Sequence, residues 1–380
     1  MESVASSQRR KGRRRGKGRR RGKARPVFPD IPEEVIRQIL ERLPLDSLSR
    51  FKCVSKTWLS LISDFSDKLR GKEKVLVVSH DFLHSVDLEN SFGERLYESE
   101  DFPKCRREIY GSCNGILLMV IDFDFFLWNP LTSYFKQVLH YSEAPPPDCS
   151  VVSGLCYESS TDDYVVVMVL VLNCWTPGYG YRKVVVGSLK NKSWTEIDYS
   201  SYIIESFTSG PIVNEHLHWL VSMAGEPEYS QIVFFNVQMG SFERVPMPQP
   251  KHRDGDLAYG LGVLDGCLCM SRSENPSDGE CNYIEVLVMK EYGVANSWTH
   301  MYVVSNFRPS GYTRKGAAFA LKKPPQGENW QSKDVWHISV YNPIDNSTRD
   351  IPIPTPMPTC FYHVDAVIYE ESLVKPTDYN

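Results

Sequence analysis

Four side chains have the residue types and the spacing of a metal site. His216 and His218 stand two residues apart in one extended run, and Cys267 and Cys269 do the same in another. Residues i and i+2 of a strand share one face, so either pair could ligate a cation. A third copy of the same hairpin carries Ile and Leu at these positions, which favours packing inside a sheet over ligation. We expect no metal and no cofactor.

No enzyme motif accompanies these pairs. The chain lacks the G-x-S-x-G elbow of serine hydrolases, the phosphate-binding P-loop, the H-E-x-x-H zinc motif and the cysteine spacing of zinc domains. Its ten cysteines are scattered without CxxC pairs, which suits free, mostly buried thiols in a reducing compartment better than a disulfide framework. We therefore expect a protein that binds other molecules and is not an enzyme.

Charge is distributed unevenly along the chain. Residues 1–25 hold 12 Lys and Arg and one acidic residue, a net charge of +11, whereas the remainder sums to −15. The basic run has no apolar period and repels itself, so residues 1–29 are expected to form a disordered tail. Such a tail can be a nuclear import signal, a nucleic-acid contact or a segment without a specific role. We expect the protein in the nucleus, the cytoplasm or both.

No apolar run is long enough to span a membrane. The longest, Val165–Leu172, has eight residues, far below the roughly 18 that a spanning helix needs, and its β-branched residues are typical of a buried strand. No apolar segment of a secretion signal follows the basic N-terminus. A membrane is therefore not an expected partner.

Three short amphipathic helices are predicted between residues 30 and 64. Pro32 suits the start of the first helix, and Pro44 is expected to end it. Apolar residues recur at helical spacing, which gives each helix one apolar face. A unit of under about 40 residues seldom buries enough apolar surface to fold alone. The apolar faces therefore pack either on another protein or on the chain's own larger domain.

The sequence of residues 31–64, IPEEVIRQILERLPLDSLSRFKCVSKTWLSLISD, resembles the F-box motif in the form common in plant F-box proteins. The similarity spans the whole motif without a gap. It implies an F-box over residues 30–70 that binds a Skp-type adaptor and, through the adaptor, the cullin and RING subunits of a ubiquitin ligase. The implied adaptor-binding surface is drawn from Ile31, Pro32, Ile39, Leu40, Leu43, Pro44, Leu48, Cys53, Val54, Trp58 and Ile62.

Beyond residue 70 the helical period disappears, and β-branched and aromatic runs alternate with turn residues. A unit of strand, polar turn and strand starts at residues 127, 186, 234, 287 and 340, at spacings of 59, 48, 53 and 53. Kelch-type blades repeat about every 50 residues. A second hairpin precedes the unit, with turn pairs such as Asn114-Gly115 and Asp265-Gly266. With Ser85–Leu96 as a further outer hairpin, residues 71–380 are predicted to be mainly β, a kelch-like β-propeller of about six blades.

An aromatic residue follows the polar turn in most copies of this unit. The recurrence favours a place in the blade cores over a platform for stacking nucleic-acid bases. A nucleic-acid surface would also need positive charge, which the body of the chain lacks. The residues concerned are Phe135, Trp194, Phe242 and Trp298.

The same region resembles the F-box-associated domain of plant F-box proteins. The similarity is clearest at GSCNGIL (111–117), LWNPLT (127–132) and GLCYESSTDDYVVV (154–167). An F-box followed by such a domain implies a substrate receptor that brings an unidentified protein to a ubiquitin ligase for degradation. The alternative is a nuclear scaffold that contacts nucleic acid through its basic tail, and an enzyme with a propeller pocket is a third, weaker interpretation.

The substrate is expected to contact loops on one rim of the propeller, because rigid blades hold variable loops in place. The candidate contacts are aromatic residues in these loops, since Trp and Tyr are enriched at binding hot spots. They are Trp175, Tyr179, Tyr181 and Trp330. The longest interruptions of the repeat are Asn173–Arg182, Met223–Ser230, Lys251–Tyr259, Ser271–Asn282 and Lys322–Asp334.

Overall fold

A computed structural model describes most of the chain after the basic tail. The chain divides into two compact units, Met1–Arg42 and Leu43–Asn380. The described residues are 31–66, 69, 71–78, 83–96, 108–143, 149–172, 182–197, 202–204, 210–223, 226–249, 258–273, 283–305, 308–322, 336–353 and 365–375. The basic run at residues 9–25 and the four aromatic substrate candidates lie outside them.

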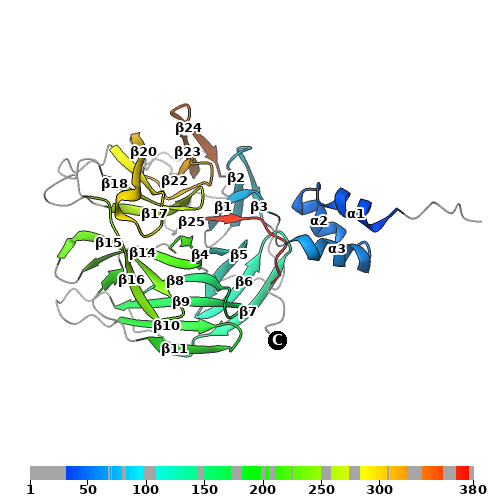
Figure 1. The fold of residues 1–380 in the computed structure, drawn as a ribbon, viewed down its shortest axis with the longest axis horizontal. Coiled ribbons are helices and arrows are strands. Elements are labelled where there is room, and N and C mark those ends of the chain that lie inside the picture. Colours follow the sequence, from blue (N-terminus) through cyan, green and yellow to red (C-terminus); the bar gives the residue numbers. More distant parts are fainter. Residues whose placement is uncertain are drawn as a thin grey trace, which may run out of the picture. The chain divides into compact units, whose positions relative to one another are not determined.

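The three predicted helices are present (Figure 1). In the first unit, α1 (Glu33–Leu40) follows Pro32 directly. In the second unit, α2 (Leu45–Phe51) follows Pro44, and α3 is Lys56–Ser66. The prediction that Pro44 ends the first helix was wrong: α1 ends at Leu40, and Pro44 instead starts α2, where its missing N–H costs no hydrogen bond. Within the described residues, no helix is long and apolar enough to cross a membrane.

The described strands of the second unit form six antiparallel sheets, which are the blades of a β-propeller (Figure 1). Blade 1 contains β1 (Glu73–Val78), β2 (Leu83–Asp87), β3 (Phe92–Arg95) and β25 (Asp365–Glu370). Blade 2 contains β4 (Glu108–Cys113), β5 (Ile116–Ile121), β6 (Asp124–Asn129) and β7 (Tyr134–His140). Blade 3 contains β8 (Cys149–Glu158), β9 (Asp163–Leu172), β10 (Arg182–Ser188) and β11 (Ser193–Ile197). The predicted architecture of about six blades is confirmed.

The remaining three blades follow the same order along the chain. Blade 4 contains β12 (Tyr202–Ile204), β13 (Ile212–Val213), β14 (His216–Met223), β15 (Glu226–Asn236) and β16 (Ser241–Val245). Blade 5 contains β17 (Ala258–Leu264), β18 (Cys267–Ser273), β19 (Tyr283–Met289) and β20 (Trp298–Ser305), with a short 3₁₀ helix at Ala295–Ser297. Blade 6 contains β21 (Gly311–Tyr312), β22 (Ala318–Lys322), β23 (His337–Asn342) and β24 (Ser347–Pro352).

Blade 1 joins the two ends of the propeller sequence. Its first strand is β25, which pairs antiparallel with β1 so that Glu73 lies opposite Glu370. Blade 6 is bonded to this junction, because the backbone N–H of Arg314 donates to the Glu73 carboxylate at 2.9 Å and its guanidinium pairs with Glu370. The last strand in the sequence therefore completes the first blade.

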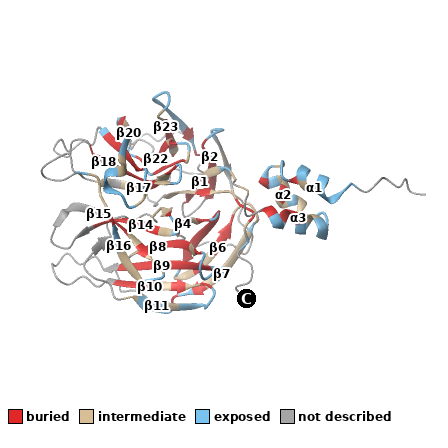
Figure 2. Cartoon of the chain, viewed as in Figure 1, coloured by how far each residue is buried: buried red, intermediate tan, exposed pale blue. Residues whose placement is uncertain are grey.

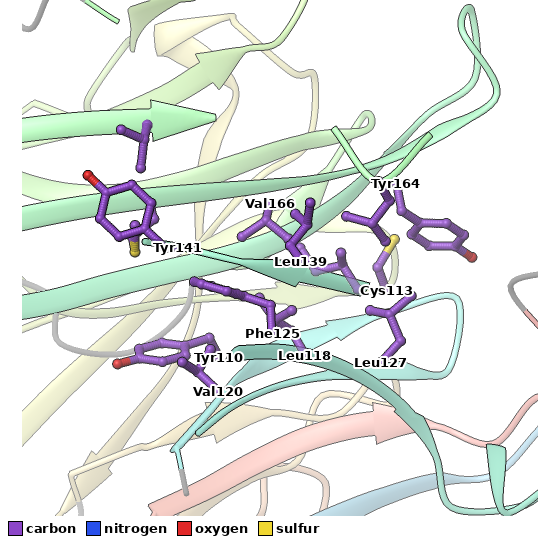
Figure 3. Packing of buried hydrophobic residues seen from close by; sticks show 14 of the residues in the cluster. Tyr110, Cys113, Leu118, Val120, Phe125, Leu127, Leu139, Tyr141, Tyr164 and Val166 are labelled. Atoms are coloured by element: carbon purple, nitrogen blue, oxygen red, sulfur yellow. The ribbon is translucent and has the colours of Figure 1, made fainter. Parts of the chain in front are cut away.

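Each pair of neighbouring blades shares one hydrophobic cluster. In β9, Val166 and Met168 face blade 2 while Val165 and Val167 face blade 4, because alternate residues of a strand point to opposite faces. Figure 3 shows the blade 2–3 cluster, in which Leu118 and Phe125 meet Val166. Figure 2 shows the buried residues concentrated along strands such as β8 and β9. Cover on both faces explains why residues 165–170 of this strand are continuously apolar.

The polar turns of the repeat are stabilised by side-chain hydrogen bonds. In five of the six blades described, the last residue of the third strand accepts a backbone N–H two or three residues later, as in an Asx or Ser turn. The acceptor–donor pairs are Asp87 with Glu89 (3.0 Å), Asn129 with Leu131 (3.0 Å), Ser188 with Asn191 (3.0 Å), Asn236 with Met239 (3.1 Å) and Asn342 with Ile344 (3.0 Å). This bond is the physical basis of the repeat that the sequence comparison detects.

Glycines in the first strands allow neighbouring blades to pack closely. A Cβ on Gly262 of blade 5 would lie 2.4 Å from the ring of Tyr312 in blade 6, whereas a Cβ on Gly260, two residues earlier, would lie 3.5 Å from Ser271. The first distance is too short for real atoms and the second is an ordinary contact. Of these two glycines, only Gly262 is therefore required to be glycine by its neighbour.

We predict that Gly262→Ala lowers the free energy of unfolding by about 1–3 kcal/mol, because the added methyl group overpacks the blade 5–6 interface. Gly260→Ala, the control on the same strand, should change it by less than about 1 kcal/mol. Urea unfolding followed by tryptophan fluorescence measures both. Equal stability of the two variants would contradict the close packing of Gly262 on Tyr312.

Candidate binding surfaces

The first helix carries an uncovered apolar stripe. Ile31 precedes the helix by two residues, and Val35 and Ile39 lie four residues apart on one side of it. They are 58%, 43% and 51% exposed. Large apolar side chains aligned in this way are typical of a surface that another protein covers.

Two more exposed apolar residues lie in the helical segment of the second unit. Val54 is 59% and Leu59 45% exposed. They flank Trp58, whose ring packs edge-on against Phe51 at a centroid distance of 5.4 Å. Ser55 caps α3 by accepting the backbone N–H of Trp58 at 3.1 Å. The cap and the ring pair fix the start of α3 and, with it, the direction of Leu59.

The eleven residues expected to bind the adaptor differ in exposure. Leu40, Leu48 and Ile62 are fully buried, so these side chains present no surface of their own in this chain. The adaptor-binding surface implied by the resemblance omitted the exposed Val35 and Leu59, since a sequence pattern identifies an apolar face but not which of its residues stay uncovered. The exposed members are Ile31, Pro32, Ile39, Pro44, Cys53 and Val54, and Leu43 and Trp58 are partly buried.

The two rims of the propeller carry different sets of connections. Because neighbouring strands are antiparallel, the turns between first and second strands and between third and fourth strands share one rim, here called the short-turn rim. The links between second and third strands and between blades share the other, here called the long-loop rim. The chain enters the propeller at the short-turn rim, because Glu73 begins β1 opposite the end of β25.

All five predicted interruptions are anchored at the long-loop rim. Four of them connect a second to a third strand, for example β18 to β19, and the fifth leads from blade 4 into blade 5. The interruption at Met223–Ser230 was predicted as a loop, and this was wrong for most of its length: β14 runs to Met223 and β15 starts at Glu226. The ladder continues there because a bulge at Ser222–Met223 lets the two strands stay paired.

The His and Cys pairs lie in the blades as predicted. His218 is fully buried, its Nε2 is 2.7 Å from the Tyr292 hydroxyl, and burial lowers its pKa to about 4, so it is neutral near pH 7. Cys269 is also fully buried in the cluster between blades 5 and 6, and burial raises the pKa of its thiol. Among the described residues, no group of three or more His, Cys, Asp or Glu could hold a metal ion.

The aromatic residues after the polar turns pack on the inter-blade clusters, which confirms their assignment to the blade cores. Two of them also bond to the preceding blade. The indole N–H of Trp194 donates to the carbonyl of His140 at 2.9 Å, and that of Trp298 donates to the carbonyl of Pro246 at 2.8 Å. These bonds connect the outer strands of neighbouring blades.

Two buried cations lie at the long-loop rim, each at an interface with the preceding blade. Arg272 is paired with Glu285 at 2.7 Å, and their side chains are 6% and 2% exposed. Arg272 also donates to the carbonyl of Gln249, in the link from blade 4, at 3.1 Å. Lys183 donates to Glu143, in the link from blade 2, at 2.6 Å and pairs with Glu196 at 2.8 Å, and these bonds raise its pKa. Both cations thereby fix an inter-blade link.

Comparison with known protein families agrees with this architecture. A model of the F-box associated beta propeller domain matches residues 69–323, and a model of the F-box domain matches residues 28–70. The chain belongs to the family of plant F-box proteins with an F-box associated β-propeller. In this family assignment the exposed apolar stripe falls in the F-box, and the two rims belong to the associated domain.

Relatives of this F-box protein occur in Arabidopsis thaliana. F-box protein CPR1 is 29% identical over 310 residues, covering 72% of this chain and 73% of the relative. F-box/kelch-repeat protein At3g23880 is 28% identical over 302 residues, covering 72% of this chain and 79% of the relative. An F-box joined to a propeller supports a general role as a substrate adaptor of a ubiquitin ligase.

We predict that Arg272→Met in this F-box protein lowers the free energy of unfolding by about 3–5 kcal/mol, because it removes the buried cation that lies 2.7 Å from the buried Glu285 carboxylate and leaves the half-exposed His300, at 3.9 Å, as a more distant partner. The double variant Arg272→Met/Glu285→Leu should be close to the unsubstituted protein, since no buried charge remains. Thermal unfolding compares the two.

The matched control is Lys322→Met, which removes a cation from a loose pair with Asp350 at 3.9 Å that is about half exposed on both sides. It should change the unfolding free energy by no more than about 1 kcal/mol. If the single variant at Arg272 were as stable as this control, the ion pair would not be a buried constraint.

Proposed function

We propose that this chain is a non-catalytic substrate receptor of a Skp-cullin-F-box ubiquitin ligase. The observation that supports it best is the exposed stripe Ile31, Val35 and Ile39 within the segment that matches the F-box domain. Covering such a stripe with a Skp-type adaptor would bring the cullin and RING subunits to the chain. Ubiquitin transfer is then carried out by those subunits, and the propeller selects the protein to be degraded.

The long-loop rim is the proposed substrate-binding side. It anchors the long interruptions of the repeat, while the F-box segment joins the propeller at the opposite, short-turn rim. A substrate held at the long-loop rim would therefore leave the chain's entry point free. Trp175, Tyr179, Tyr181 and Trp330 remain proposed contacts on sequence grounds.

We predict that Ile39→Asp weakens binding of a purified Skp-type adaptor at least about tenfold, because a charge replaces an apolar contact worth roughly 1.5–3 kcal/mol. Ile39 is half exposed, so the variant should fold normally. The control is Val294→Asp, which introduces the same charge at an exposed apolar residue of the propeller. It should bind the adaptor like the unsubstituted chain. Isothermal titration calorimetry measures the affinities.

The complementary variant replaces Trp175, Tyr179, Tyr181 and Trp330 with Ala. It should retain adaptor affinity while slowing the turnover of proteins that accumulate around the intact receptor in proximity labelling with blocked proteasomes. Unchanged adaptor binding by Ile39→Asp would refute the adaptor surface, and unchanged turnover in the loop variant would place substrate recognition elsewhere.

The basic tail supports two further proposals, a nuclear address and, as the alternative function, contact with nucleic acid. The tail carries +11 and the rest of the chain −15, so any nucleic-acid contact would have to come from the tail. Import is the preferred role, because it is compatible with the ligase function and needs no basic surface on the propeller. The expected location is the nucleus, the cytoplasm or both.

We predict that deleting residues 1–25 moves a fluorescent fusion toward the cytoplasm and leaves adaptor affinity unchanged. Microscopy and calorimetry measure the two effects. A deletion that keeps its location but loses salt-sensitive RNA or DNA binding would instead favour the nucleic-acid scaffold.

A further inference from the structure

The interface between blades 4 and 5 changes character as it approaches the long-loop rim. Further from this rim, Met270 and Leu287 pack against Leu220 and Ile232 in an apolar cluster. Two residues further along each strand, Arg272 and Glu285 take the same face and form the buried ion pair. A buried ion pair is often no more stabilising than apolar residues of similar size. The pair stands next to interface positions that carry apolar residues, and such exceptions to apolar packing often occur at functional sites.

Tyr283 lies at the rim end of this interface. It is the first residue of β19, and alternation places it on the same face as Glu285 and Leu287, toward blade 4. It is 55% exposed, although it pairs in the ladder with Ser305. The Tyr283 ring is thus an uncovered aromatic surface above the ion pair.

Among the described residues, the other large exposed apolar side chains do not lie at the long-loop rim. Five of the ten lie in the helical segment, residues 31–66, and Met301 lies within β20. Met239, Val294 and Ile344 lie in turns between third and fourth strands, on the short-turn rim. At the long-loop rim, Tyr283 is the exposed aromatic residue among the described ones.

The ion pair fixes the surroundings of Tyr283. Arg272 bonds to Glu285 within β18–β19 and to the carbonyl of Gln249, so it ties the link from blade 4 to the strand that carries Tyr283. The arginine and glutamate charges cancel and both side chains are buried. The site therefore offers a stacking surface with no net charge from this pair, which suits an uncharged aromatic or proline side chain.

We propose that Tyr283 is a specificity-determining contact for the protein substrate, which stacks an aromatic or proline side chain on its ring, and that Arg272 and Glu285 are positioning residues for it. This inference rests on the proposed receptor function. It adds a described residue on blade 5 to the loop aromatics named above and defines the chemistry of the substrate segment.

The experiment combines photocrosslinking with reconstituted ubiquitination. The full chain with p-benzoylphenylalanine at position 283 is expressed with its adaptor in plant cells with blocked proteasomes, and the same chain with the crosslinker at position 344, on the other rim, is the control. Proteins crosslinked from position 283 but not 344 are then purified and used as substrates of the reconstituted ligase. Tyr283→Ala should slow their ubiquitination at least about tenfold, as expected for a hot-spot residue.

Two control variants separate the aromatic ring from general effects. Tyr283→Phe keeps the ring and should ubiquitinate these substrates within about twofold of the unsubstituted rate, as should Ile344→Ala. Adaptor affinity should be the same in all three variants.

The outcomes distinguish this inference from the function on which it rests. If Tyr283→Ala ubiquitinates the substrates at the normal rate, Tyr283 is not a specificity contact, and the receptor function stands. If position 283 crosslinks no protein that the ligase ubiquitinates, the inference is also overturned. If the unsubstituted chain supports no adaptor-dependent ubiquitination, the receptor function fails as well.

Discussion

Face-to-face packing of the blades is the constraint on which the propeller depends. Each blade has two apolar faces, and each face is covered only when the neighbouring blade is in place, so six clusters connect the blades in a closed series. Burial of one large apolar side chain contributes roughly 1.5–3 kcal/mol, and every cluster contains several. The series closes only because β25 pairs with β1 and blade 6 then packs on blade 1. The first and last segments of the propeller are therefore stabilised by each other.

The separation of the two rims follows from the same packing. Antiparallel four-stranded blades that all face the same way must send equivalent turns to the same rim. Most turns between third and fourth strands are held by Asx-type hydrogen bonds such as that of Asn236, whereas blade 5 has a longer connection there with a short 3₁₀ helix. Links at the other rim can lengthen without disturbing the clusters, because loop insertions cost little stability. Binding residues can thus vary at one rim while the chain enters at the other.

Buried charges mark the places where this apolar scheme is interrupted. Lys183 and Arg272 both lie at the long-loop rim, at the interface with the preceding blade, and both hold an inter-blade link. Burying an apolar residue at either position would cost less free energy, but an apolar residue could not form a hydrogen bond to the link. The propeller therefore has fewer apolar contacts but a fixed geometry at the rim where we propose substrate binding.

Local patterns in the sequence determined the helices, the repeat and most of the blades. The β-branched run at residues 165–172, the turn pair Asn114-Gly115 and the polar turns of the outer hairpins act within a few residues, so their effect can be predicted without the rest of the chain. The position of Pro44 was harder to interpret, because a proline suits the end of one helix and the start of the next equally well.

Only the tertiary structure decided which apolar and charged residues stay uncovered. Leu40 and Ile39 are neighbours on the predicted apolar face of one helix, yet one is fully buried and the other half exposed, because burial depends on what packs against each side of the helix. Arg272 and Glu285 are thirteen residues apart, and only the pairing of β18 with β19 brings them together. Tyr283 becomes distinctive once the rims are defined, and the rims follow from the direction of every strand in the closed series of blades. Contacts between residues distant in sequence set these features, and no local pattern records them.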